Sequence, residues 1–184
     1  MDNGASSYHR FLDGDESGFA ELIKMYARGL TFFVNGYVGN ITVSEDIMED
    51  TFCDLALHRH RFKGKSSFKT YLFSIARNKA VDYIRRNSKV SPMSEEELNR
   101  QSDETAELEN TVITDERNSQ INHALKSINT DYRMVLHLIF FEDVTYEQAS
   151  LILHKSGKQM HDLVYRAKQS LKAAMEKEGF TYEE

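Results

Sequence analysis

A stretch without core-forming residues, from Pro92 to Glu116, divides this 184-residue chain. It begins at the only proline and carries nine acidic side chains but few large apolar ones. A segment of this composition cannot bury enough apolar surface to offset the entropy lost on folding. We therefore predict two small domains, residues 1–89 and 117–184, joined by an acidic flexible linker over residues 90–116. The linker could be a solvated tether, or its acids could stand in for nucleic acid in a basic channel.

Apolar residues on both sides of the linker recur at intervals of three and four, which is the spacing of a helix face. The first predicted helix spans residues 17–38 and ends at Gly39 and Asn40. A second, about residues 43–60, has the capping-box pattern at Thr42 and Glu45. No strand of convincing length occurs, so the predicted fold is all-α: two small helical domains.

The second predicted helix has an acidic face and an apolar face. Its spacing buries Ile47, Met48, Thr51, Phe52 and Leu55, and it exposes Glu45, Asp46, Glu49, Asp50 and Asp54. We expect Cys53 to be an ordinary packing residue. A solvated acidic surface and a binding surface are both compatible with this pattern.

Residues 59–89 concentrate positive charge in a chain whose net charge is −6. They hold ten Lys and Arg residues against one acid, Asp82, and aromatic residues lie between the cations. Cations beside rings suit a phosphate backbone with unstacked bases. Lys63 to Ser67 should form a turn, with the hydroxyl of Ser66 or Ser67 capping a third helix from Phe68.

The third predicted helix packs through a stripe that consists of Phe68, Leu72, Ile75, Ala76, Ala80 and Ile84. Its opposite face gathers Tyr71, Ser74, Asn78 and Arg85, with Arg77 on the shoulder. This basic outer face could bind DNA or could be an ordinary solvated surface.

The C-terminal part contains two capping-box patterns, Thr145 with Gln148 and Ser156 with Gln159. The short helices that they start are separated by a tight turn, and the second is apolar at Met160, Leu163, Val164, Ala167, Leu171 and Ala174. This is helix-turn-helix spacing, although a small helical bundle would fit it too.

Several classes of function are disfavoured. No apolar run approaches the length of a membrane span, and the N-terminus lacks the apolar core of a signal peptide, so we expect a cytoplasmic protein without membrane insertion. The lone Cys53 allows no internal disulfide and no zinc cluster. The acidic residues form rows without a His or Cys at ligand spacing. We therefore expect no enzyme activity, no metal and no cofactor.

The chain resembles sigma-70-type transcription initiation factors in two places. SEDIMEDTFCDLALHRHRFKGKSSFKTYLFSIARNKAVDYIRR is similar to their region 2, and NTDYRMVLHLIFFEDVTYEQASLILHKSGKQMHDLVYRAKQSL is similar to their region 4. Two helical domains and a linker, with nothing added, resemble the extracytoplasmic function group. The resemblance implies a subunit that binds core RNA polymerase, recognises promoter DNA and helps to melt it.

The resemblance also implies site residues. The polymerase contacts would be Asp46, Ile47, Met48, Glu49, Asp50 and Asp54. The region 2 contacts with DNA would be Phe62, Lys63, Gly64, Lys65, Ser66, Ser67, Arg77, Asn78, Arg85 and Arg86. The loop among them would capture a flipped base of the promoter element nearest the start site, since stacking and base-edge contacts can offset the cost of opening the duplex.

The second domain departs from the family pattern. Ala149 stands where a bulky aliphatic residue is usual, and His154 stands where a glycine is usual. Leu151, where a polar residue is usual, could restore some packing. The candidate contacts of the recognition helix are Lys158, Gln159, His161, Asp162, Tyr165 and Arg166. Asp162 would repel a phosphate but could accept a hydrogen bond from cytosine. Leu163 is interpreted as a core residue.

Two readings of the resemblance remain. The first is a promoter-specificity subunit, with an anti-sigma protein as a further expected partner. The second is a sigma-like interaction module that binds an anti-sigma protein without starting transcription, which the altered recognition helix keeps open.

Overall fold

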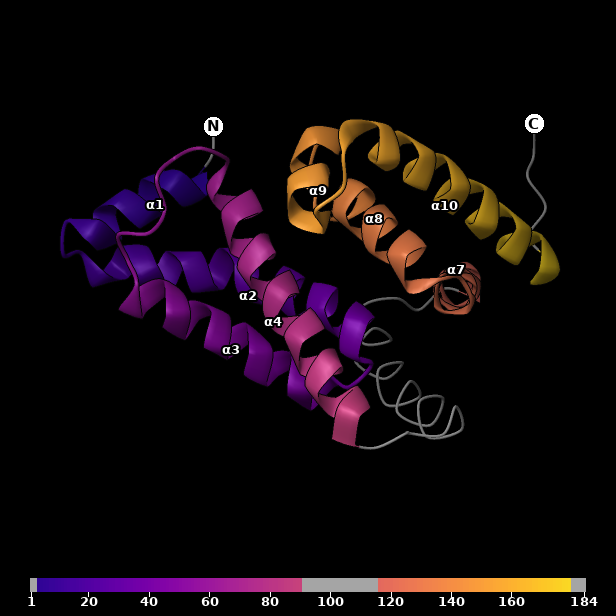
Figure 1. The fold of residues 1–184 in the computed structure, drawn as a ribbon, viewed down its shortest axis with the longest axis horizontal. Helices are drawn as coiled ribbons and strands as arrows, with labels where there is room; N and C mark the ends of the chain where they lie inside the picture. The colour runs from indigo at the N-terminus through magenta and orange to yellow at the C-terminus, as the bar shows by residue number, and fades with distance from the viewer. Residues whose placement is uncertain (1–2, 91–115, 180–184) are drawn as a thin grey trace.

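The structure, a computed structural model, describes residues 3–90 and 116–179, and every regular element in these two ranges is a helix (Figure 1). The N-terminal part contains α1 (Asn3–Leu12), α2 (Glu16–Val38), α3 (Ile41–Leu57) and α4 (Phe68–Val90). The C-terminal part contains α7 (Glu116–Ser127), α8 (Thr130–Phe140), α9 (Tyr146–Leu153) and α10 (Gly157–Lys177). The all-α prediction is confirmed. Residues 91–115 of the predicted linker lie outside the described residues.

Capping residues determine where α2 begins and ends and where α3 begins. The Asp15 side chain accepts a hydrogen bond from the Ser17 amide at the start of α2, and Gly39, with φ 66°, ends this helix as predicted. The start of α3 was predicted wrongly at Thr42. The Asn40 side chain accepts from the Val43 amide at 3.0 Å, so the helix begins at Ile41. Because the Asn40 side chain caps the free Val43 amide, Thr42 lies inside the helix and is not its cap.

The sequence pattern did not reveal α1, which packs along α2 (Figure 1). Tyr8 is 1% exposed and Phe11 is 8% exposed. The Tyr8 hydroxyl donates to the backbone carbonyl of Arg59, which lies just before the basic loop. The close approach of α1 to α2 depends on Gly18, where a Cβ atom would lie 2.4 Å from the carbonyl oxygen of Ser7. Helix α1 therefore supports the segment that leads into the loop.

The predicted helix-turn-helix spacing corresponds to α9 and α10. Both capping boxes are present, at Thr145 with Gln148 and at Ser156 with Gln159. His154 ends α9 in the left-handed region, with φ 53° and ψ 45°. Leu151 is exposed, so it adds no core packing there.

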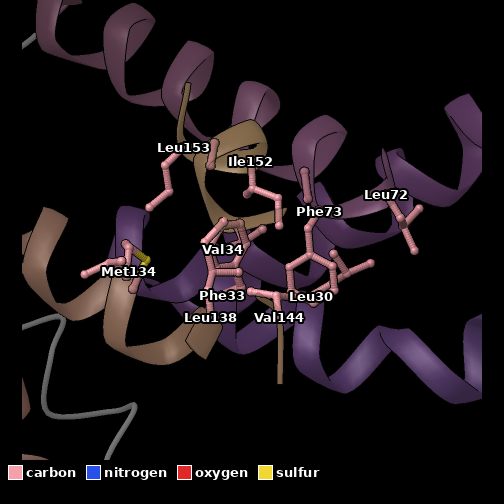
Figure 2. Close-up of a cluster of buried hydrophobic side chains, with 14 of the residues drawn as sticks. Leu30, Phe33, Val34, Leu72, Phe73, Met134, Leu138, Val144, Ile152 and Leu153 are labelled. Carbon is pink, nitrogen blue, oxygen red and sulfur yellow. The ribbon is translucent and has the colours of Figure 1, made fainter. Parts of the chain in front are cut away.

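One continuous apolar cluster joins the two parts of the chain (Figure 2). In this cluster α8 packs on α2, and α9 packs on α4. Phe33 and Phe73 come from the N-terminal part, and their ring centroids are 5.2 Å apart. Met134, Leu138, Val144, Ile152 and Leu153 come from the C-terminal part and lie around them in Figure 2. The two parts are therefore docked against each other.

Docking changes which side chains of α4 are buried. Phe68, Leu72, Ala76 and Ala80 are fully buried, as the predicted stripe requires. Phe73 lies off that stripe but is also fully buried, because the C-terminal part covers a second side of the helix. Ile84 was predicted to be buried but is 39% exposed, since the buried part of the described helix ends at Ala80.

Candidate nucleic-acid interface

The basic loop before α4 is open to solvent at its cations. Lys63 and Lys65 are both exposed, and Gly64 between them has φ 68°, a conformation that favours glycine. Nothing lies within 4 Å of the position that a Cβ atom on Gly64 would occupy. The loop therefore presents two cations around a backbone that a ligand can approach closely.

The side chains of Ser66 and Ser67 make different hydrogen bonds. The Ser67 hydroxyl accepts a hydrogen bond from the Thr70 amide at 3.1 Å, which makes Ser67 the cap of α4, one of the two positions predicted. The Ser66 hydroxyl donates to the Ser67 carbonyl at 3.2 Å. Ser66 therefore takes no part in the cap.

Phe62 is part of an aromatic cluster that anchors the loop. Its ring centroid lies 5.3 Å from that of Tyr8, 5.5 Å from that of Phe68 and 5.1 Å from that of Tyr71. The packing on Tyr8 and Phe68 is edge-to-face, which holds the Phe62 ring in place. Phe62 therefore orients the loop, and its ring is half-buried.

Arg77 and Asn78 of α4 contact residues of other helices. Burial raises the pKa of Tyr37 to about 12, although the charge and a hydrogen bond of Arg77 act in the opposite direction. The guanidinium group therefore sits against the Tyr37 hydroxyl. The Asn78 Oδ1 atom lies 3.1 Å from His154 Nε2 at the end of α9. Both predicted DNA contacts thus have partners inside the docked molecule.

The remaining predicted contacts of α4 are exposed. Arg85 pairs with Asp82 at 3.0 Å, one turn away on the same helix, and both side chains are largely in solvent. Such surface pairs contribute little and exchange readily for another anion. Arg86 is exposed as well. These two arginines extend the positive surface along α4 beyond the docked region.

The outer face of α10 carries all six predicted contacts in exposed positions, namely Lys158, Gln159, His161, Asp162, Tyr165 and Arg166. The Gln159 side chain is engaged in the cap, because its Oε1 accepts from the Ser156 amide at 2.8 Å. The His161 ring lies edge-on to Tyr146, with centroids 5.2 Å apart. Leu163 is half-buried against the apolar cluster, as its interpretation as a core residue requires.

The acidic face of α3 lies on the surface at Asp46, Glu49 and Asp50. Asp54 is half-buried and its Oδ1 lies 3.0 Å from His58 Nδ1. Ile47 is 7% exposed and belongs to the core, so its side chain supports this face from beneath. Met48 is half-buried against the same core. Cys53 was predicted to be a packing residue, but it is exposed among the acids because it lies on their side of the helix.

Sequence reasoning missed the polar contacts that cross between the two parts. Glu142 Oε2 lies 2.7 Å from Lys69 Nζ of the N-terminal part. Within the C-terminal part, Glu142 Oε1 lies 3.6 Å from His137 Nε2, which is too far for a hydrogen bond. Burial alone would raise the pKa of Glu142, but the neighbouring His137 and Lys69 outweigh it and lower this pKa below its usual value. Residues so far apart in the chain leave no periodic pattern that predicts such a contact.

The described residues hold no cluster of three or more His, Cys, Asp or Glu side chains that could bind a metal ion. None of the helices in the described ranges combines the length and the apolar character that crossing a membrane requires.

Comparison with known proteins identifies the region around the loop. The family model described as Sigma-70 region 2 matches residues 22–90, from within α2 to the end of α4. The ECF RNA polymerase sigma factor SigM of Bacillus subtilis is 26% identical over 157 residues, which cover 83% of this chain and 92% of the relative. Residues 22–90 therefore hold a sigma-70 region 2 domain, and the resemblance of the sequence to the sigma-70 family is confirmed. The resemblance of its sequence to the extracytoplasmic function (ECF) group is likewise confirmed.

Further relatives and solved structures are similar over most of the chain. The ECF RNA polymerase sigma-E factor of Escherichia coli K12 is 25% identical over 170 residues, 88% of each chain. The structure of CnrH in complex with the cytosolic domain of CnrY has a TM-score of 0.62 at 20% identity and covers 95% of both chains. The sigma factor RpoE, in complex with the anti-sigma factor NepR from Bartonella quintana, has a TM-score of 0.66 at 18% identity, covering 86% of this chain and 96% of that one. These two structures share the fold.

Proposed function

We propose that this sigma-70 family protein is a promoter-specificity subunit, which binds core RNA polymerase, brings it to promoters and helps to melt them without chemistry of its own. The observation that carries the proposal is the exposed loop around Lys63 and Lys65, within the segment that matches sigma region 2. Work with RNA polymerase implies a cytoplasmic location.

Three surfaces would divide the work. The exposed acids of α3 face away from the core and would bind the polymerase, with Ile47 holding the face in shape from below. The loop and the outer part of α4 would bind the promoter element nearest the start site. The exposed face of α10 would bind duplex DNA further upstream, as the recognition helix of a helix-turn-helix unit does.

Melting requires the loop to recover the cost of opening base pairs. Taking a base out of the stack costs a few kcal/mol. Lys63 and Lys65 would hold the backbone of the opened strand, and the Gly64 backbone allows that strand to approach closely. The Ser66 hydroxyl would contact the edge of the captured base. Since the Phe62 ring is held in its own cluster, recognition would rest on polar contacts and shape more than on stacking on that ring.

In vitro transcription tests the proposal. Core RNA polymerase with the purified chain, on a library of bacterial genomic fragments, should give discrete transcripts that core polymerase alone does not make. Absence of such transcripts, although the chain comigrates with core polymerase, would reject promoter recognition.

A second candidate is a sigma-like module that binds an anti-sigma protein without initiating transcription. The contacts of Arg77 with Tyr37 and of Asn78 with His154 favour it, because both side chains already have partners within the chain. The two structural neighbours are described as complexes, CnrH with CnrY and RpoE with the anti-sigma factor NepR. We propose that an anti-sigma partner exists under either function. The transcription assay separates the two functions.

A further inference from the structure

We propose that Tyr8 of α1 is a positioning residue for the basic loop: its hydroxyl holds the backbone at the entry to the loop, so that residues 63–66 are arranged for nucleic acid before it binds. The effect on nucleic acid rests on the proposed function, whereas the arrangement of the free loop does not. Tyr8 is 1% exposed, so it acts through the loop and not by touching nucleic acid.

The Tyr8 hydroxyl joins two backbone groups of the segment that enters the loop, which runs beside α1 (Figure 1). It donates a hydrogen bond to the carbonyl of Arg59. Burial raises the pKa of this hydroxyl above its usual value, and a backbone hydrogen bond from Phe62 acts in the opposite direction. The hydroxyl therefore keeps its proton at neutral pH and stays a donor. Because Arg59 and Phe62 are three residues apart, one side chain holds both ends of this segment.

The ring of Tyr8 contacts both sides of the loop. Its centroid lies 5.3 Å from that of Phe62, which precedes the loop, and 5.1 Å from that of Phe68, the first residue of α4. Packed aromatic rings of this kind have a defined geometry. Tyr8 therefore ties the two ends of the loop to each other as well as to α1.

A second residue of α1 holds the same entry segment. The guanidinium group of Arg59 lies over the ring of Phe11, 5.2 Å from its centroid. Tyr8 and Phe11 are three residues apart and so lie on one face of α1. One face of this helix thus contacts both the backbone and the side chain of Arg59.

The middle of the loop depends on its ends. Lys63, Gly64 and Lys65 are exposed, so packing does not fix them. The far end is fixed by the Ser67 hydroxyl, which accepts from the Thr70 amide. A binding site that is competent for only part of the time binds its ligand with an affinity reduced by that fraction. Loss of the anchor at the entry should therefore weaken binding although no contact with the ligand is removed.

Limited proteolysis of the full chain with trypsin tests the arrangement of the free loop. Tyr8→Phe removes the hydroxyl and keeps the ring. Cleavage after Lys63 and Lys65, followed by mass spectrometry, should become roughly threefold to tenfold faster, because loss of one hydrogen bond shifts the opening equilibrium by about that factor. Tyr132→Phe, at a half-buried tyrosine of α8, should leave the rate unchanged. Equal cleavage of Tyr8→Phe and the unaltered chain would overturn the proposal.

Binding of a fluorescent, mixed-sequence single-stranded DNA oligonucleotide tests the effect on nucleic acid. Tyr8→Phe should weaken binding by roughly threefold to tenfold, and Tyr132→Phe should not. The slope of the logarithm of the binding constant against the logarithm of the salt concentration should stay unchanged in Tyr8→Phe, because no phosphate contact is removed. Unchanged affinity, or a loss of affinity with a changed slope, would overturn the positioning role.

A double-mutant cycle separates positioning from a general structural role. In a chain that already carries Lys63→Glu and Lys65→Glu, Tyr8→Phe should weaken binding by less than about twofold, since the groups that it positions are gone. The same loss of affinity in both backgrounds would show a merely structural role and overturn the proposal. Absence of promoter-dependent transcripts, together with the expected effects of Tyr8→Phe on cleavage and binding, would instead reject the proposed function alone.

Discussion

The two helices proposed to bind DNA differ in what covers them. The predicted contacts of α10 are all exposed, from Lys158 to Arg166. On α4, Arg77 lies against Tyr37 of α2 and the exposed Asn78 contacts His154 of the C-terminal part, while Arg85 and Arg86 remain in solvent. Each helix shows a candidate DNA-binding face in sequence, so the pattern identifies a candidate surface but not its accessibility. Accessibility depends on a contact between segments that are distant in the chain.

The two helices should also differ in how much they contribute to stability. The outer face of α10 could change with little effect on folding, whereas α4 is buried on two sides and supports both parts of the molecule. Substitutions on the two helices should therefore separate effects on stability from effects on DNA binding.

The largest expected effect is on stability, at the docked side of α4. Phe73→Ala should lower the free energy of unfolding by about 3–5 kcal/mol, because the fully buried ring leaves a cavity between the two parts. Tyr165→Ala, on the exposed face of α10, should change it by less than about 0.5 kcal/mol. Urea denaturation followed by circular dichroism measures both. Similar values for the two variants would remove the contrast between the helices.

The next effect concerns the loop that leads into α4. Lys63→Glu combined with Lys65→Glu should weaken binding to promoter DNA about 100-fold at low salt. If two phosphate contacts are lost, the slope of the logarithm of the binding constant against the logarithm of the salt concentration should become less steep by roughly 1.8. Titrations at several salt concentrations measure the slope. Lys24→Glu, at an exposed position of α2, is the control. An unchanged slope would show that these lysines do not contact phosphates.

A smaller change is expected on α10. Asp162→Lys should tighten binding to duplex DNA by about tenfold and alter the preferred upstream sequence, because an acid near the phosphates is replaced by a cation. Selection from a randomised duplex library measures the preference. Glu176→Lys, near the far end of the same helix, should leave the preference unchanged. If both variants select the same sequences as the unaltered chain, Asp162 lies away from the bases.

The smallest effect concerns the turn between α9 and α10. His154→Gly should raise the free energy of unfolding by about 1 kcal/mol, because glycine adopts the left-handed conformation at this position without the strain of a side chain. Lys155→Gly, where φ is not positive, should lower it. Thermal denaturation measures both shifts. A loss of stability in His154→Gly would mean that the contact with Asn78 outweighs the strain.

Local patterns predicted much of the fold. The capping boxes at Thr145 and Ser156 and the end of α2 at Gly39 follow from side chains that bond within a few residues. The left-handed His154 follows in the same way. Helix α1 escaped prediction, although Tyr8 and Phe11 have helical spacing, because a short helix gives a weak signal.

The sequence predicted those features of the candidate site that depend only on residues close together in the chain. The loop around Lys63 was predicted by composition and the cap at Ser67 by position, and both lie where expected. The engagement of Phe62, the burial of Phe73 and the Lys69–Glu142 pair were not predictable, because each depends on tertiary contacts. The roles of the individual site residues in binding stay predictions.

Permanganate reactivity of promoter thymines tests the central claim most directly, since it detects bases that have been unpaired. In complexes of core polymerase with this chain, we expect reactive thymines at the promoter element nearest the start site. The Lys63→Glu, Lys65→Glu variant should lose that reactivity, while Lys24→Glu retains it. Equal reactivity with the loop variant and the unaltered chain would contradict the claim that this loop opens promoter DNA.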